Sequence, residues 1–160
     1  MEEKIKQVIE ILTEKEKTIS TMESCTGGGV ANAITNIEGA SEVLKFGAVT
    51  YSNEFKEKMG VDKNIIDTYS VYSMETADEM SKNISKFTSA DYGIGITGKL
   101  NRIDKNNPYG EDNIVFISIY EKATDKFYQK KIQVKNQTRK DNKNIVIDTI
   151  FNELLRILKR

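Results

Sequence analysis

Apolar residues recur at helical spacing near the beginning, the middle and the end of the chain. Residues three or four positions apart lie on one face of a helix, so this spacing predicts amphipathic helices. The residues concerned are Ile5, Val8, Ile9 and Leu12; then Met74, Ala77, Met80, Ile84 and Phe87; and finally Val146, Ile150, Leu154, Leu155 and Leu158. We expect these side chains to face the core, with Ser73 capping the middle helix and the last helix starting near Lys140.

Runs rich in β-branched and aromatic residues lie between these helices and predict strands at residues 18–21, 46–51, 91–97, 114–120 and 127–134. The second of these reads as a short buried strand. The last two flank a six-residue turn, so they form a hairpin and must be antiparallel. Shorter helices are expected at residues 31–37 and after Ser52, and a short helix or an irregular link is expected between residues 61 and 71. The pattern predicts a single α/β domain over residues 1–160, a three-layer α/β/α sandwich with a mixed sheet of about five strands.

The turn after the first strand is the most distinctive stretch, and it reads Thr-Met-Glu-Ser-Cys-Thr-Gly-Gly-Gly over residues 21–29. The first N–H groups of a helix lack partners within the helix, and glycines let a ligand approach the backbone closely. The turn is therefore a candidate site for an anion or a developing oxyanion. An ordinary strand-to-helix connection, capped by Ser24 or Thr26, is the alternative interpretation.

Composition narrows the chemistry further. The 160 residues include 24 Lys and Arg and 24 Asp and Glu, so the formal net charge is zero. No overall electrostatic field therefore favours binding to nucleic acid or to a membrane. No stretch is apolar enough to span a bilayer, and the start of the chain lacks a signal-peptide pattern. The single cysteine, Cys25, cannot form an internal disulfide. We therefore expect a cytoplasmic protein that binds neither nucleic acid nor membranes.

The sequence contains no histidine. This absence excludes Ser-His-Asp and Cys-His catalysis and HExxH zinc sites within the chain. Any acid-base chemistry must use Lys, Tyr, Asp, Glu, Cys or a cofactor. A serine nucleophile would need a different base, and we expect a lysine whose pKa is lowered, acting directly or through a tyrosine.

Two segments resemble a known family. Glu-Ser-Cys-Thr-Gly-Gly at residues 23–28, followed by Thr-Tyr-Ser-Asn-Glu at residues 50–54 and then Lys56, is similar to the CinA C-terminal domain over essentially the whole chain. The family's characterised activity is nicotinamide mononucleotide deamidation, which releases nicotinate mononucleotide and ammonia. The resemblance implies a small nucleotide substrate, no cofactor, no metal and a homo-oligomer.

The same resemblance implies roles for individual residues. Ser24 matches the family's nucleophile, and Tyr51 and Lys56 match its general acid/base pair. Cys25, beside Ser24, is an alternative nucleophile, but without a histidine to form an ion pair we expect it to be a small buried residue. The N–H groups of residues 26–28 could hold the oxyanion of the tetrahedral intermediate. The residues implied in substrate binding are Thr26, Gly27, Gly28, Asn53, Gly98 and Arg139.

The chain departs from the family in two regions. The segment after Gly98 lacks the internal glycines of typical members, although Lys99 and Arg102 could replace backbone N–H groups by charge. Near the last helix, Arg139 is followed by Lys143 where the family tends to carry a second arginine. Two alternatives therefore remain: the same machinery acting on another small amide, or a catalytically silent protein that binds a nucleotide or a partner.

Overall fold

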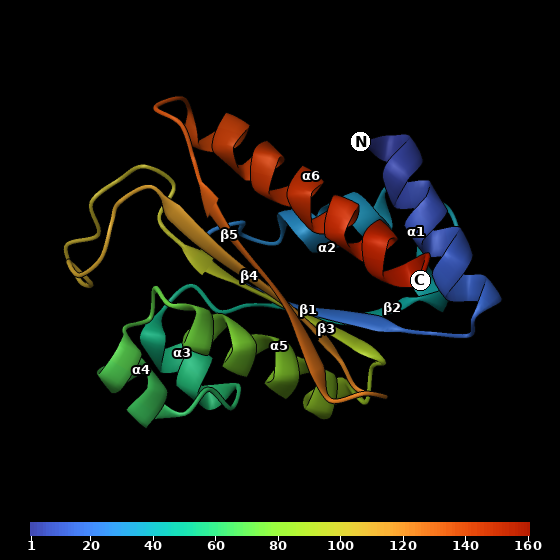
Figure 1. Cartoon of the computed structure of the whole chain (residues 1–160), viewed down its shortest axis with the longest axis horizontal. Helices are drawn as coiled ribbons and strands as arrows, with labels where there is room; N and C mark the ends of the chain where they lie inside the picture. Colours follow the sequence, from blue (N-terminus) through green and yellow to red (C-terminus); the bar gives the residue numbers. More distant parts are fainter.

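The computed structural model describes residues 1–160 and contains one sheet between two layers of helices (Figure 1). The helices are α1 (Glu2–Glu14), α2 (Gly29–Thr35), α3 (Asn53–Lys58), α4 (Lys63–Tyr69), α5 (Met74–Thr88) and α6 (Arg139–Leu158), with a short 3₁₀ helix, η1 (Ala40–Glu42). The strands are β1 (Ile19–Glu23), β2 (Leu44–Val49), β3 (Tyr92–Gly98), β4 (Ile114–Glu121) and β5 (Lys126–Gln133). None of these helices is both long and apolar enough to cross a membrane.

The sheet has the strand order β2-β1-β3-β4-β5. Strand β1 pairs in parallel with both β2 and β3, whereas β4 pairs antiparallel with β3 and with β5. This confirms the predicted mixed five-stranded sheet and its terminal hairpin. Because β1, β2 and β3 run in the same direction, their carboxyl ends lie at one edge of the sheet.

Helices α1, α2 and α6 cover one face of the sheet, and α3, α4 and α5 cover the other (Figure 1). The first face holds a cluster of 25 buried hydrophobic residues, and the second holds a smaller cluster of six around Met80. The predicted caps form: the Ser52 hydroxyl accepts a hydrogen bond from the N–H of Phe55, and the Ser73 hydroxyl accepts one from the N–H of Thr76.

Two predictions of burial were wrong. Strand β2 was expected to be buried, but it is the edge strand, and Phe46 and Val49 are 40% and 52% exposed. An edge strand lacks a neighbour on one side, so apolar content alone does not bury it. Phe87 was expected in the core, but it lies in the last turn of α5, is 65% exposed, and its ring packs at a tilt against that of Phe46.

Two glycines let α5 approach the centre of the sheet. A Cβ atom built on Gly95 would lie 2.3 Å from the carbonyl oxygen of Ala77, and one on Gly93 would lie 1.9 Å from that of Ser81. Both obstacles are helix backbone, which cannot move without displacing α5. The small residues of β3 are therefore a packing requirement.

We expect the Gly95→Ala substitution to lower the free energy of unfolding by about 3 kcal/mol, because the helix must shift to accept the methyl group. The matched control is Gly29→Ala. Its added Cβ would lie 2.7 Å from the flexible end of Ile147, so its cost should stay below about 1 kcal/mol. Urea unfolding of both variants measures the difference, and equal costs would contradict this account of the packing.

Candidate active site

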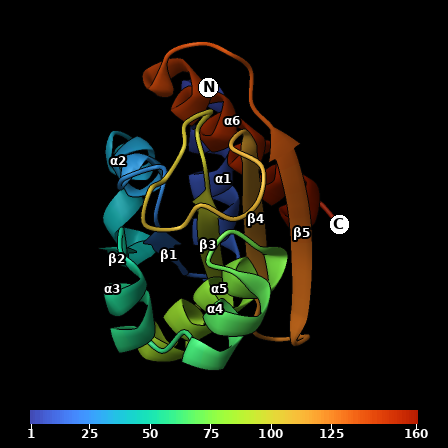
Figure 2. The ribbon, with the colours of Figure 1, turned by 90° about the vertical axis from the view of Figure 1, so that its left-hand side faces the viewer.

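The predicted functional residues gather at the carboxyl ends of the three parallel strands, the edge that faces the viewer in Figure 2. Ser24 follows β1, Tyr51 lies two residues beyond β2, and Gly98 ends β3. Backbone hydrogen bonds tie these ends together: the Ser24 N–H donates to the Ile96 carbonyl at 3.1 Å, and the Thr50 N–H donates to the Glu23 carbonyl at 2.8 Å. Ligand sites are common at this edge in open α/β sheets.

The structure brings Ser24 and Lys56 into direct contact. The Lys56 Nζ lies 2.9 Å from the Ser24 Oγ and 2.6 Å from the carbonyl oxygen of Thr50. Lys56 is 2% exposed and Ser24 is 7% exposed. Burial disfavours the charged ammonium and lowers the pKa of Lys56 to about 8. A substantial fraction of this amine is therefore neutral at mildly alkaline pH and can accept a proton from the serine.

Glu23 fixes the turn that carries Ser24, and sequence reasoning gave this residue no role. Its buried carboxylate accepts hydrogen bonds from the N–H groups of Val30 at 2.9 Å and Ala31 at 3.0 Å, and from the Thr26 hydroxyl at 2.7 Å. The first N–H groups of α2 are thus satisfied within the protein. Glu23 ends β1 and precedes the glycine-rich start of α2. An acidic residue near a helix N-terminus is stabilising, so the sequence could have predicted this cap.

The turn itself keeps several N–H groups free. The Gly27 N–H donates to the Ser24 carbonyl at 2.9 Å, so it is not available to a ligand. The N–H groups of Cys25, Thr26 and Gly28 have no acceptor within the chain. The backbone on the carboxyl side of Ser24 therefore retains donors for an oxyanion.

Tyr51 and Arg139 meet although they are 88 positions apart in the sequence. The Tyr51 hydroxyl accepts a hydrogen bond from an Arg139 Nη at 3.3 Å, and Tyr51 is 65% exposed. No hydrogen bond joins Tyr51 to Ser24 or to Lys56. The two residues of the predicted acid/base pair therefore lie apart. Lys56 contacts Ser24 from the protein interior, whereas Tyr51 lies at the surface.

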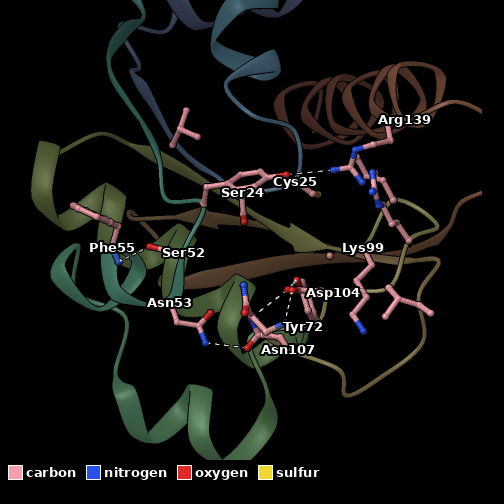
Figure 3. A pocket seen from close by; sticks show the side chains of 17 residues that line it. Ser24, Cys25, Ser52, Asn53, Phe55, Tyr72, Lys99, Asp104, Asn107 and Arg139 are labelled. Carbon is pink, nitrogen blue, oxygen red and sulfur yellow. Dashed lines mark hydrogen bonds between the residues drawn. The ribbon is translucent and has the colours of Figure 1, made fainter.

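A cavity of about 760 Å³ opens over Ser24 (Figure 3). The predicted residues on its wall are Ser24, Tyr51, Asn53, Gly98 and Arg139, whereas Lys56 is not on the wall. A Cβ on Gly98 would lie 2.6 Å from the Ile114 carbonyl oxygen, so sheet packing alone requires glycine there. Thr26, Gly27 and Gly28 line a second, neighbouring cavity of about 640 Å³ that also includes Arg139.

The divergent loop after Gly98 forms the rest of the wall. Lys99 is almost fully buried, and its ammonium donates to the Tyr109 carbonyl at 3.0 Å and the Asp112 carboxylate at 3.2 Å. The Lys99 ammonium is thus engaged in hydrogen bonds that fix the loop. It is not free to bind a ligand in place of the missing glycine N–H groups. Arg102 also lines the cavity and has no carboxylate partner.

Further contacts attach the loop to the opposite wall. The Tyr72 hydroxyl donates to Asp104, which lowers the pKa of that carboxyl group, while burial raises the pKa of the Tyr72 phenol. Asn53 donates to the Asn107 side chain at 3.0 Å, and Asn107 donates to Asp104 at 3.2 Å. Figure 3 shows these side chains converging below Ser24. The contacts of Tyr72 with Asp104 and of Asn53 with Asn107 join residues far apart in the sequence, so no local pattern predicts them.

Cys25 is the other candidate nucleophile beside Ser24. It is 4% exposed, and burial raises the pKa of its thiol to about 12. The reactive form of a cysteine is the thiolate, which is scarce at neutral pH under these conditions. The raised pKa of the thiol, together with the contact between Lys56 and Ser24, favours the serine as nucleophile. The side chains contain no group of three or more His, Cys, Asp or Glu arranged to hold a metal ion.

The lowered pKa of Lys56 links stability to pH. Between its folded value of about 8 and its ordinary value of 10.5, the unfolded chain binds more protons, so the free energy of unfolding rises with pH. Relative to a Lys56→Met variant, the wild type should gain up to roughly 3 kcal/mol across this interval. Urea unfolding at several pH values measures the gain. Lys58→Met, an exposed change in the same helix, is the control; parallel curves for wild type and Lys56→Met would contradict the assignment.

The chain is similar in sequence to longer bacterial proteins. A protein of Thermoanaerobacter sp. (strain X514), named for competence-damage induction, is 46% identical over 99 residues, which cover 61% of this chain and 24% of that protein. The CinA-like protein of Endomicrobium trichonymphae is 36% identical over 149 residues, 91% of this chain and 34% of that protein. The chain thus spans about a quarter to a third of the length of these curated relatives.

Solved structures of competence/damage-inducible proteins share the fold of this chain. The competence/damage inducible protein CihA from Agrobacterium tumefaciens superimposes with a TM-score of 0.87 at 27% identity, covering 99% of this chain and 95% of that one. The competence or damage-inducible protein from Enterobacter asburiae has a TM-score of 0.87 at 24% identity, covering 98% and 97%. A family model described as CinA C-terminal domain matches residues 1–158. The chain belongs to the CinA C-terminal domain family.

Proposed function

We propose that this protein hydrolyses the carboxamide of nicotinamide mononucleotide to nicotinate mononucleotide and ammonia, with Ser24 as nucleophile. The observation that carries the proposal is the 2.9 Å contact between the Ser24 Oγ and the buried Lys56 Nζ. A serine hydroxyl becomes an effective nucleophile when an adjacent base takes its proton, and Lys56 is the only basic side chain that contacts it. The activity is that of the family which the two sequence segments resemble.

In the first step, neutral Lys56 removes the hydroxyl proton as the Ser24 Oγ attacks the amide carbon. The carbonyl oxygen of the substrate becomes an oxyanion in the tetrahedral intermediate. Cys25 and Thr26 directly follow Ser24, and their N–H groups are free. We assign these two N–H groups as the donors to the oxyanion. Loss of one such donor typically costs about 3 kcal/mol of transition-state stabilisation.

Collapse of the intermediate requires a proton for the departing ammonia. Tyr51 lines the cavity, and its oxygen already accepts a hydrogen bond from Arg139, so its own O–H is free to point toward a ligand. We assign Tyr51 as the acid on the cavity side and Lys56 as the base on the protein side. The Lys56 ammonium then releases the serine proton to solvent and the Tyr51 phenolate takes one up, so both groups return to their starting forms. Water next attacks the acyl-enzyme while Lys56 takes its proton. Lys56 gives that proton to the departing Ser24 Oγ, which frees the product as its carboxylic acid and restores the serine hydroxyl.

The cavity also fits the size and charge of a mononucleotide. Its volume of about 760 Å³ lies in the usual range for small-molecule sites. Arg102 and Arg139 on its wall favour an anionic substrate. These properties support a phosphorylated amide over a neutral one.

A second candidate is the hydrolysis of a different small amide by the same groups. The loop after Gly98 favours it, because Lys99 is engaged with Tyr109 and Asp112 and the loop presents side chains to the cavity. A panel of carboxamides and lactams, assayed for ammonia release or ring opening, separates the two. The highest kcat/KM should belong to nicotinamide mononucleotide; a clear preference for another amide would establish the second candidate.

We expect the Ser24→Ala substitution to lower kcat for ammonia release by more than about a thousandfold, since the nucleophile is lost. The thiol of Cys25 remains in this variant, so the test also distinguishes the two nucleophiles. Ser41→Ala, an exposed change in η1, is the control and should retain full activity. Undiminished turnover by a folded Ser24→Ala protein would rule out the serine mechanism.

The activity should also rise with pH. Lys56 must be neutral to accept the serine proton, so kcat/KM should increase tenfold per pH unit below its pKa of about 8 and level off above it. Steady-state ammonia assays between pH 6 and 9.5 would measure this profile. A rate that does not change across this range would remove Lys56 from the role of base.

A further inference from the structure

The hydroxyl of Thr50 is the one buried polar side-chain group of the protein without a hydrogen bond. Thr50 is 2% exposed, so solvent does not replace the missing partner. A buried hydroxyl that lacks a partner costs stability, and a methyl group of the same shape would avoid that cost. Such an exception to the usual pairing of buried polar groups indicates a role in another state of the molecule.

The backbone places Thr50 beside the proposed base. Its N–H donates to the Glu23 carbonyl at 2.8 Å, which extends the pairing of β1 with β2 by one residue and sets Thr50 next to Ser24. Ala48, two residues earlier and so on the same face, packs against the core cluster on the side of α5. The Thr50 side chain therefore lies on the side of the sheet from which Lys56, in α3, reaches Ser24.

The hydrogen bonds of Lys56 change in number when it takes up a proton. A neutral amine has two N–H groups and a lone pair, which can accept the serine proton. The ammonium that results has three N–H groups, whereas the structure supplies two acceptors, the Ser24 Oγ at 2.9 Å and the Thr50 carbonyl oxygen at 2.6 Å. One N–H of a buried cation is therefore left without an acceptor, at a large cost.

The Thr50 hydroxyl is an acceptor without a partner, and it belongs to a residue that Lys56 already contacts. Rotation about the Cα–Cβ bond moves Oγ1 among three staggered positions and exchanges it with the methyl group. The two groups are similar in size, so this rotation needs little rearrangement of the surrounding core.

We propose that Thr50 is a positioning residue for Lys56, and that its hydroxyl accepts the third N–H of the ammonium formed when the amine takes the serine proton. In that step the Ser24 O–H bond breaks, its electron pair stays on Oγ, and the proton bonds to Nζ. Thr50 keeps its own proton throughout. The inference rests on the proposed function for the role of Lys56 as base, but the hydrogen bond itself requires no substrate.

NMR titration of the Lys56 ε-methylene group, with ¹³C-labelled lysine, tests this hydrogen bond in the free protein. Thr50→Val keeps the shape of the side chain and removes the acceptor, so the pKa of Lys56 should fall by about one unit, a tenfold loss of proton affinity. Thr50→Ala, which cannot crowd the site, should give a similar fall. Thr50→Ser keeps the hydroxyl and should retain the wild-type pKa.

The other charged or titratable groups that act on Lys56 are Cys25, in the turn after β1, and Asp104, in the loop after β3. The pKa of the Cys25 thiol is raised to about 12 and that of the Asp104 carboxyl is lowered, so neither changes charge between about pH 6 and 10. A shift in the hydroxyl-free variants therefore reports the hydroxyl. An unchanged pKa in Thr50→Val and Thr50→Ala, or an equal fall in Thr50→Ser, would overturn the proposal.

The pH profile of ammonia release separates this inference from the proposed function. In Thr50→Val the midpoint of kcat/KM should move to lower pH together with the NMR value, and Thr50→Ser should restore the wild-type profile. A shifted NMR midpoint in a protein that releases no ammonia would support the hydrogen bond and contradict the proposed function. Turnover whose pH profile is the same in Thr50→Val as in the wild type would support the function and overturn the role of Thr50.

Discussion

The buried contact between the Lys56 amine and the Ser24 hydroxyl is the constraint on which the rest of the site depends. Removing an ammonium from water costs several kcal/mol unless hydrogen bonds replace the lost hydration. Here the three N–H groups of a charged Lys56 find two acceptors, Ser24 and the Thr50 carbonyl. The charge is therefore only partly compensated, which lowers the pKa of the lysine to about 8 and suits it to accept protons.

The fold supplies the rigidity that this contact requires. Ser24 and Thr50 follow neighbouring parallel strands, and backbone hydrogen bonds hold the strand ends in register. Lys56 reaches the pair from α3, whose start is set by the Ser52 cap. The Glu23 carboxylate secures the far side of the turn by capping α2. The serine thus lies between a fixed base on the protein side and an open cavity.

The sequence predicted much of this arrangement, and the misses have physical reasons. Helical spacing and β-branched runs depend on local pattern, so the layers and the mixed sheet were predictable. Ser24 and Lys56 were predicted from resemblance alone, and the absence of histidine agreed with a lysine as the base. The exposure of β2 depends on strand order, which no local pattern reports. Lys99 and Tyr72 join partners 10 to 32 positions away, so their roles in the loop required the tertiary structure.

The most direct test of the central claim needs no knowledge of the substrate. A small sulfonyl fluoride is attacked by an activated serine oxygen, which displaces fluoride and leaves a stable sulfonate ester. Peptide mass spectrometry after such treatment should find the adduct on Ser24 in the wild type, formed faster as the pH rises toward 8, and little or none in Lys56→Met. An adduct on Cys25, or labelling of Ser24 at the same rate without Lys56, would contradict the account.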